Sequence, residues 1–469
     1  MDNQSSVRPE TRARHCRIAR WVTLASMAAW PALGAAQGVR ISGVTSTQYV
    51  ELRQLHVDTS GMESAGERVS GAPFLQDLTF AAWGLGRGVS LHSNVRIRTD
   101  LGSGGYTWPR SDQHVDVLDL YAELDRPAWR GRVGRQWVMN GLGAYDFDGA
   151  DFVLRRDRSS LEAWAGRALA AGLFETYTGP ELAAVESRPP EQDGHVYGAR
   201  ARTRSAGGNA LSVVYQRTAV AIDGGLYAER AAFDATTRMR GATLDAAGAY
   251  DFASGDWNEL RLRLAAPDIN GVNWWTEVRH SQPFFELWTI WGAFAPVGFD
   301  EARLALDARI TSLSLALGVR GGYRRYGESH AGPELRDDGW RVGADARYSP
   351  SGPFTMSAST DVDAGFGAAR WDVRGRVDWN GESGTLIGVQ GSALQNMYEF
   401  RVGTGRVFGL AANVVLPVAR DVRLAVDAGV YRHELYKGAI GPDWTQRRAA
   451  ARLEWTLGSE PGASKVKAP

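Results

Sequence analysis

Apolar and polar residues alternate along short segments of this chain, most clearly from Arg370 to Gly381. The apolar face of that segment consists of Trp371, Val373, Gly375, Val377 and Trp379. Because successive side chains of a β-strand point to opposite faces, the segment is predicted to be a strand with one apolar and one charged face. The two tryptophans are eight residues apart, or about 26 Å along a strand. With a tilt of about 40°, they would be about 20 Å apart along the membrane normal, close to the apolar band about 25 Å tall of an outer-membrane barrel.

A soluble β-sandwich strand also alternates, so the prediction of a membrane barrel depends on recurrence. The pattern recurs in 91–100, 118–125, 197–204, 259–264, 303–310, 340–348, 422–431 and 451–457. Short turns are expected at 86–88, 126–127, 205–209, 267–271, 349–353 and 380–384, and longer loops at 59–71, 102–113, 170–193, 327–338 and 434–443. Loop 170–193 is long enough to fold into the lumen or to remain in solvent.

Nine strands fit this alternation of turns and loops before about Ile222, and nine more fit after about Phe299. Five candidates lie between them, although the alternation allows only an even number, and four would give 22 strands. We therefore predict an all-β fold, a single closed antiparallel transmembrane β-barrel of about 18–22 strands. The strand pattern begins at about Val39, so no plug domain is expected.

Closure is required because lipid offers no hydrogen-bond partners to the open edges of a sheet. After residue 36 the sequence has no apolar run of 18 residues, so no spanning helix is predicted. The mean hydropathy of −0.29 and the 23% charged residues are compatible with a barrel, because alternate side chains face a polar lumen.

Residues 1–36 have the pattern of a cleaved secretory signal peptide: five arginines, an apolar core from Trp21 to Ala32, and Gly34-Ala35-Ala36 as the cleavage site. An uncleaved anchor is the alternative. The barrel is assigned to residues 37–458 and a polar C-terminal tail to 459–469. The predicted location is the outer membrane of a Gram-negative bacterium. The only cysteine, Cys16, lies in the signal, so the exported chain has no disulfide.

The charged faces of the predicted strands are expected to line the pore collectively. These residues are Arg96, Arg98, Asp119, Glu123, Arg200, Arg202, Arg204, Arg261, Arg263, Arg303, Asp307, Arg309, Arg341, Asp345, Arg347, Asp372, Arg374, Arg376, Asp378, Arg423 and Asp427. The runs at 200–204 and 261–263 lack interleaved acids and predict a positive stripe that favours anionic solutes. The aromatics expected at the membrane interfaces are Trp340, Tyr348, Trp371, Trp379 and Trp455.

Catalytic chemistry has little support in the sequence. The eight histidines are scattered, with no HExxH motif, no pair at metal-ligand spacing and no GxSxG motif, so no catalytic residue, metal or cofactor is expected. Asp146, Asp148 and Asp151 cluster near a predicted outer loop, and an outer-membrane barrel enzyme with a carboxylate site at its rim is one alternative. Turn-forming and strand-end carboxylates are the simpler interpretation. A secreted soluble all-β carbohydrate-binding protein is the other alternative.

The segment from Asp119 to Arg155 resembles the early hairpins of Gram-negative outer-membrane porin-like barrels. It is similar in particular to alginate-export-type barrels, through an acidic-aromatic strand, Gly134-Arg135-Gln136 and Phe147-Asp148-Gly149. The resemblance implies an arginine-lined lumen that passes an anionic polysaccharide. The chain departs from the pattern at Arg135, which shares the parity of its apolar neighbours and is expected at a bulge or rim. It also departs at its end, because twelve residues follow Leu457 where such barrels usually finish on an aromatic.

Together these features predict a passive, water-filled channel for small hydrophilic solutes or saccharides, with anion preference as a separate and finer prediction. The expected partners are outer-membrane lipid, the solutes, and the barrel-assembly machinery during biogenesis. No nucleic acid is expected, because the chain after residue 36 is near neutral, with 48 basic and 51 acidic residues.

Overall fold

A computed structural model gives the fold of most of the chain. It describes residues 38–57, 63–86, 88–101, 115–169, 194–220, 225–282, 298–327, 337–365, 368–396, 405–435 and 442–458. The predicted signal peptide, C-terminal tail and loop 170–193 lie outside these ranges, so those three expectations stay predictions.

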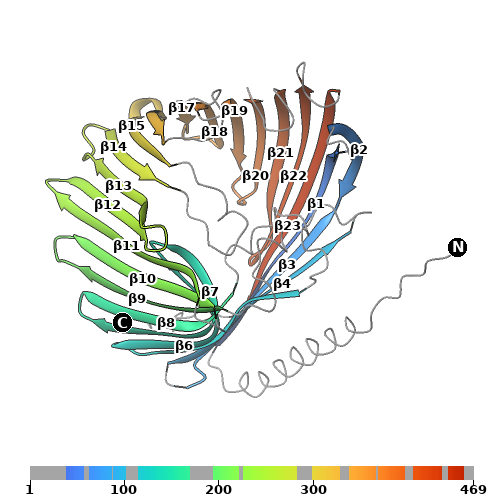
Figure 1. The fold of residues 1–469 in the computed structure, drawn as a ribbon. Coiled ribbons are helices and arrows are strands. Elements are labelled where there is room, and N and C mark those ends of the chain that lie inside the picture. The colour runs from blue at the N-terminus through green and yellow to red at the C-terminus, as the bar shows by residue number, and fades with distance from the viewer. Residues whose placement is uncertain are drawn as a thin grey trace, which may run out of the picture.

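The described chain forms one antiparallel sheet whose strands surround a common interior (Figure 1). The strands are β1 (Gly38–Val57), β2 (Glu63–Gly71), β3 (Pro73–Trp83), β4 (Val89–Asp100), β5 (Val115–Asp125), β6 (Trp129–Asn140), β7 (Gly143–Arg156), β8 (Ser159–Ala168), β9 (Gly194–Arg204), β10 (Ala210–Val220), β11 (Leu226–Met239), β12 (Ala242–Asp251), β13 (Asp256–Ala265), β14 (Val272–Ser281), β15 (Phe299–Ile310), β16 (Leu315–Tyr326), β17 (Asp338–Tyr348), β18 (Phe354–Gly365), β19 (Ala368–Asn380), β20 (Leu386–Asn396), β21 (Gly405–Ala419), β22 (Val422–Leu435) and β23 (Trp444–Gly458). A 3-10 turn, η2 (Thr311–Leu313), joins β15 to β16. No helix in these ranges is long and apolar enough to cross a membrane.

Strand β1 closes the sheet by pairing on both of its edges. Gly43 lies opposite Leu78 of β3 on one side and opposite Trp455 of β23 on the other. The closed wall therefore contains 22 strands, namely β1 and β3 to β23. Nine of these strands lie before residue 221, the next four are β11 to β14, and the last nine are β15 to β23. The observed 22 strands fall within the predicted range of about 18–22, and β11 to β14 are the four strands for which the alternation left room between the two sets of nine.

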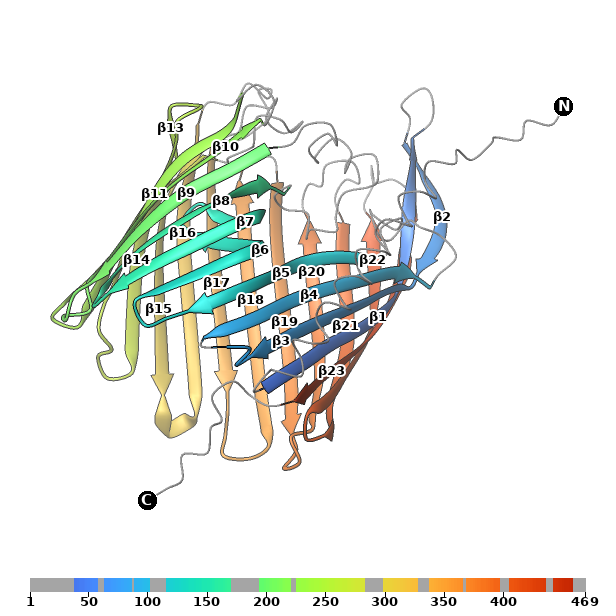
Figure 2. The same cartoon turned by 90° about the horizontal axis from the view of Figure 1, so that it is seen from below.

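Strand β2 falls where a loop from 59 to 71 was predicted, and that prediction was wrong. It pairs with the outer half of β1, and Val50 opposite Gly71 continues the register of Thr47 opposite Phe74 in β3. The pairing of β1 with β23 ends at Val50, so the β1–β2 hairpin projects beyond the rim (Figure 2). A hairpin outside the wall does not separate lipid from lumen, so its sequence need not alternate.

Short turns connect the strands at one end of the barrel, at all six predicted positions. The turn between β13 and β14 contains Asn270 and Gly271 with φ of 55° and 80°. Arg240 and Gly241 join β11 to β12 with φ of 50° and 87°. Two positive φ angles in a two-residue loop define the type I′ turn, whose twist matches that of the flanking strands.

The apolar face of the sheet carries two sets of aromatic side chains. Near the long-loop end, Tyr323 lies opposite Trp340, and near the short-turn end Phe354 lies opposite Trp379. All four rings are among the exposed large hydrophobic residues. Bands of exposed aromatics separated by apolar residues are the girdles of a membrane barrel.

Candidate functional site

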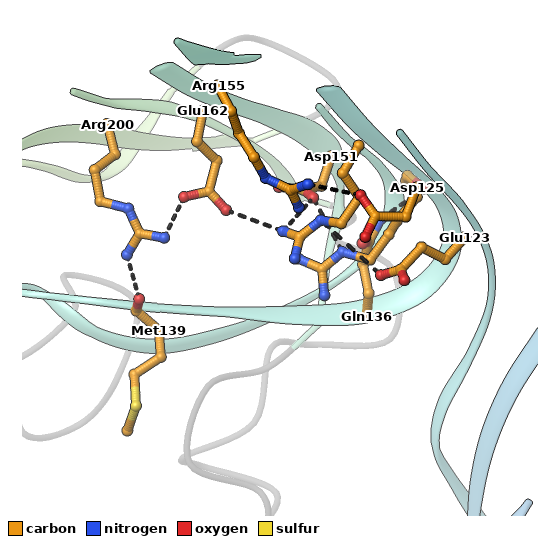
Figure 3. Close-up of polar contacts among 11 residues, drawn as sticks. Glu123, Asp125, Gln136, Met139, Asp151, Arg155, Glu162 and Arg200 are labelled. Atoms are coloured by element: carbon orange, nitrogen blue, oxygen red, sulfur yellow. Dashed lines mark hydrogen bonds and ion pairs between the residues drawn. The ribbon is translucent and has the colours of Figure 1, made fainter. Parts of the chain in front are cut away.

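The interior face of the wall is identified by a contact between strands that are not neighbours. The guanidinium of Arg200 on β9 donates a hydrogen bond to the carbonyl oxygen of Met139 on β6 (Figure 3), although β7 and β8 lie between them in the sheet. Side chains of one sheet meet across intervening strands only on its concave side. Arg200 therefore points into the barrel, and residues that share its face through the strand register do so as well.

The register places every charged residue predicted to line the pore on this interior face. They are Arg96, Arg98, Asp119 and Glu123 on β4–β5; Arg200, Arg202 and Arg204 on β9; Arg261 and Arg263 on β13; Arg303, Asp307 and Arg309 on β15; Arg341, Asp345 and Arg347 on β17; Asp372, Arg374, Arg376 and Asp378 on β19; and Arg423 and Asp427 on β22. The aromatics Trp340, Tyr348, Trp371, Trp379 and Trp455 fall on the opposite face. Period-2 alternation alone is enough to make this separation.

Asp151 on β7 is the centre of a buried charged cluster on the interior face (Figure 3). It is 2% exposed, and one of its oxygens lies 3.0 Å from Nε of Arg132 and 3.2 Å from Nη2 of Arg130. Arg130 also lies 3.8 Å from Glu162 of β8 and 3.9 Å from Glu123 of β5. The cluster joins four neighbouring strands by cross-strand ion pairs, which stabilise a sheet of this curvature.

The predicted positive stripe on β9 loses the charge of its first residue, Arg200. Arg200 pairs with Glu162, and each side chain is less than a tenth exposed. The neutralising acid comes from the neighbouring strand, so inspection of β9 alone could not reveal it. Arg202 and Arg204 have no ion pair within the described ranges.

The second predicted basic run differs from the first, because neither Arg261 nor Arg263 has an ion pair among the described residues. Arg263 lies opposite Glu277, and its guanidinium stacks 4.3 Å from the ring centre of Trp275. Arg261 lies opposite another arginine, Arg279. The stacking on Trp275 holds the guanidinium of Arg263 against the wall.

Glu301 organises the opposite wall. Its side chain is almost fully buried. Oε1 lies 3.0 Å from a guanidinium nitrogen of Arg324 and 3.0 Å from one of Arg341, and Oε2 contacts Arg303. One carboxylate thus links β15, β16 and β17. Such a ladder holds the wall in shape rather than offering a free charge to the lumen.

The tip of the β6–β7 hairpin leaves the wall and folds into the interior. Pairing of β6 with β5 ends at Arg135, and pairing of β7 with β8 ends at Phe147. In the strand register residues 136–146 therefore pair with each other, and one further backbone hydrogen bond of 3.0 Å runs from Leu169 N–H to the carbonyl oxygen of Asp146. Arg230 of β11 donates 3.2 Å hydrogen bonds to the carbonyl oxygen of Leu142 and to the hydroxyl of Tyr145. Because β11 is four strands from β7, the tip crosses the inner surface of the barrel.

Apolar packing fixes the hairpin against the wall. Val138, Leu142 and Phe147 are 3%, 7% and 0% exposed and belong to one cluster with inward-facing residues of the wall. The wall side of this cluster consists of Trp164, Ala168, Val196, Val214, Ala232 and Ala249 on β8–β12. A signal was present in the sequence, because apolar residues at interior parity are out of place in a water-filled lumen. The prediction of an inward-folding segment concerned loop 170–193 instead of this hairpin.

Arg135 marks the point where the hairpin departs. Gly134 before it has a φ of 127°, and a Cβ there would come within 2.3 Å of the carbonyl oxygen of Leu120. Arg135 pairs with Asp148 at 2.7 Å and donates a 3.0 Å hydrogen bond to the carbonyl oxygen of Val117, which lies beyond the paired register of β5 with β6. The register of β6 with β5 and β7 has no bulge at Arg135, which instead lies where the pairing with β5 ends.

The three aspartates considered as a catalytic cluster do not form one site. Asp151 lies on the interior face, bound to two arginines, whereas Asp146 and Asp148 lie on the other face of β7, where Asp148 binds Arg135. Residues that alternate along a strand are separated by the sheet itself. Across the part of the chain that the structure describes, no group of three His, Cys, Asp or Glu side chains is arranged to hold a metal ion.

Solved structures of outer-membrane barrels resemble this fold. A mutant of the ferric enterobactin receptor PfeA of Pseudomonas aeruginosa is 10% identical, with a TM-score of 0.51 over 89% of this chain and 80% of that chain. OccAB4 of Acinetobacter baumannii (8% identity, TM-score 0.40, 90% and 99% covered) and a BenF-like porin of Pseudomonas fluorescens (10%, 0.41, 89% and 99%) also match, with lower structural similarity. The sequence matches no protein-family model and no curated protein. These similarities concern the fold, and none supports the narrower likeness to alginate-export barrels.

Proposed function

We propose that this protein is an outer-membrane channel through which small hydrophilic solutes diffuse passively. The observation that carries the proposal is the closed 22-strand wall, with aromatics and aliphatics on its outer face and charged residues on its inner face. An apolar outer band requires a lipid environment, and a charged inner face requires water. A wall with both properties spans a membrane, and its water-filled lumen connects the two aqueous compartments on either side.

The inward hairpin gives this channel its constriction. Residues 136–146 occupy interior space, and they are anchored by Arg200 and Arg230 and by the apolar cluster around Phe147. A hairpin held by buried packing is a fixed narrowing rather than a loose loop. It limits passage to solutes of small cross-section.

The finer parts of the proposal concern solute and biogenesis. Arg202, Arg204 and Arg261 support a preference for anionic solutes, including acidic saccharides, because rings or rows of arginine favour anions in pores. Export by a cleaved signal peptide at 1–36 and insertion by the barrel-assembly machinery complete the proposal. Passive diffusion through a lumen lined by arginine, aspartate and glutamate needs no cofactor.

Conductance across a planar bilayer tests the proposal directly. The purified protein should migrate differently on gels before and after boiling, partition with detergent, and form stable ohmic channels in symmetrical KCl. Liposomes containing it should swell in neutral sugars of small size and not in large ones. A protein that stays in solution without detergent and shows no conductance would instead be the soluble carbohydrate-binding alternative.

The sign of the ion preference needs its own measurement. In a KCl gradient, the reversal potential should have the sign of anion selectivity. A cation-selective potential would reject the anion preference while leaving the channel itself intact.

A further inference from the structure

A cavity of about 790 Å³ opens on the interior side of strands β6 to β11, toward their short-turn ends. It lies beside the Arg200–Glu162 pair, and its lining includes Arg202, Arg204 and Arg158. This volume falls in the range of about 300–1,000 Å³ that is typical of small-molecule sites.

The strand register gives this cavity an ordered row of polar side chains. Arg202 lies directly between Ser160 of β8 and Ser212 of β10, and Ser212 lies opposite Asp234 of β11. Arg204 follows two residues along β9, about 7 Å away. The row therefore offers two guanidinium groups, two hydroxyls and one carboxylate on the same face.

The charge balance of the row is positive. Arg200 is neutralised by Glu162, but Arg202 and Arg204 have no ion pair among the residues that the structure places. Both are exposed to the interior. The donors of a guanidinium form a planar fork that matches the two oxygens of a carboxylate. Two adjacent arginines therefore favour a carboxylate over an anion such as chloride, which has no fixed acceptor geometry.

We infer that this basic pocket, defined by Ser160, Arg202, Arg204, Ser212 and Asp234, binds a small hydroxylated carboxylate of the size of a hydroxy acid or a sugar acid. The carboxylate lies on Arg202 and Arg204. Its hydroxyl groups donate to Asp234 and exchange hydrogen bonds with the two serines. The inference rests on the proposed function, because such a solute reaches the pocket through a water-filled lumen.

Solute flux into liposomes tests the pocket, with gluconate as the probe and glucose as its neutral counterpart. For the native protein, the initial rate of gluconate entry should saturate with concentration, while glucose entry should remain linear. A variant with R202Q and R204Q should raise the half-saturating gluconate concentration about tenfold or more, because the carboxylate loses its charge-assisted hydrogen bonds. Lysines at both positions should give an intermediate value, because they keep the charge and lose the fork.

Arg309→Gln provides the matched control. Arg309 also faces the interior near a short-turn end and is exposed, but it belongs to β15 and does not line this cavity. Its loss removes the same kind of charge from the lumen and should leave half-saturation within about twofold. An equal effect of both variants would show a general field rather than a site, and would overturn the inference.

Two further outcomes separate the inference from the proposed function. Linear gluconate entry into liposomes that still admit glucose would reject the pocket and leave the channel standing. Entry of neither solute, without ionic conductance, would reject the channel. Each variant is first shown to fold by its unboiled gel migration.

Discussion

The guanidinium of Arg200 bridges the side chain of Glu162 on the adjacent strand and the carbonyl oxygen of Met139 on a strand three positions away. One side chain thereby couples the charge balance of the wall to the position of the inward hairpin. The adjacent cluster around Asp151 extends this coupling to β5, β6 and β7.

Replacing Arg200 should destabilise the barrel strongly. In Arg200→Leu the buried Glu162 loses its closest partner and keeps only the more distant Arg130, and breaking a buried ion pair typically costs about 3–5 kcal/mol. Urea unfolding in lipid vesicles, followed by tryptophan fluorescence, measures the free energy of unfolding. Adding Glu162→Leu to the same chain should recover a large part of the loss, since no uncompensated charge then remains. A double variant as unstable as the single one would contradict this assignment.

Removing the hairpin tip should widen the channel. Gln136 lies opposite Phe147, so an Asn-Gly pair substituted for residues 137–146 closes the hairpin with a two-residue type I′ turn. Single-channel conductance in KCl should rise clearly, and larger sugars should enter liposomes. Shortening the projecting β1–β2 hairpin by the same number of residues is the control and should leave conductance unchanged. An unchanged conductance after removal of 137–146 would show that the hairpin is not the constriction.

Phe147 tests the packing that holds this hairpin. Its ring is fully buried, and truncation of a buried phenylalanine typically costs about 3–5 kcal/mol. Phe147→Ala should therefore lower the urea midpoint and increase current fluctuations as the tip loosens. Phe152→Ala, five residues along the same strand but 44% exposed on the outer face, should cost less in detergent micelles. An equal loss of stability in both variants would contradict the assignment of Phe147 to the buried interior and Phe152 to the outer face.

Glu301 should matter more than other interior acids. Glu301→Gln removes the buried carboxylate that Arg303, Arg324 and Arg341 share, so we expect a loss of about 3 kcal/mol or more in unfolding free energy, measured by the same urea titration. Asp345→Asn is the comparison, because its side chain is 46% exposed and its pair with Arg320 is solvated. That change should cost less than about 1 kcal/mol.

The pairing of β1 with β23 closes the barrel, and its close packing can be tested. A Cβ on Gly43 would come within 2.4 Å of the ring of Trp455, so Gly43→Val should disturb the pairing of β1 with β23 and reduce the fraction that shows unboiled barrel migration. Overpacking of this kind typically costs about 1–3 kcal/mol. Trp455→Ala in the same chain should restore the folded fraction. A failure of rescue would place the defect in the backbone of β1 instead.

Residue alternation alone determined the main architecture of this protein. The period of two separated Trp371 and Trp379 from Arg374 and Arg376, and the alternation of short turns and long loops predicted about 18–22 strands, of which the structure has 22. This was possible because every wall strand meets lipid on one side and water on the other, so each segment carries the same constraint locally. The projecting strand β2 was missed because it lies beyond the wall, where that constraint ends.

The tertiary structure decided where charges cancel and where the lumen narrows. Glu162 neutralises Arg200 from another strand, and the tip around Leu142 reaches Arg230 across four strands. Both relationships depend on the stagger and curvature of the closed sheet, which no single segment encodes. The sequence assigned each side chain to a face, and the closed sheet determined which side chains on that face come into contact.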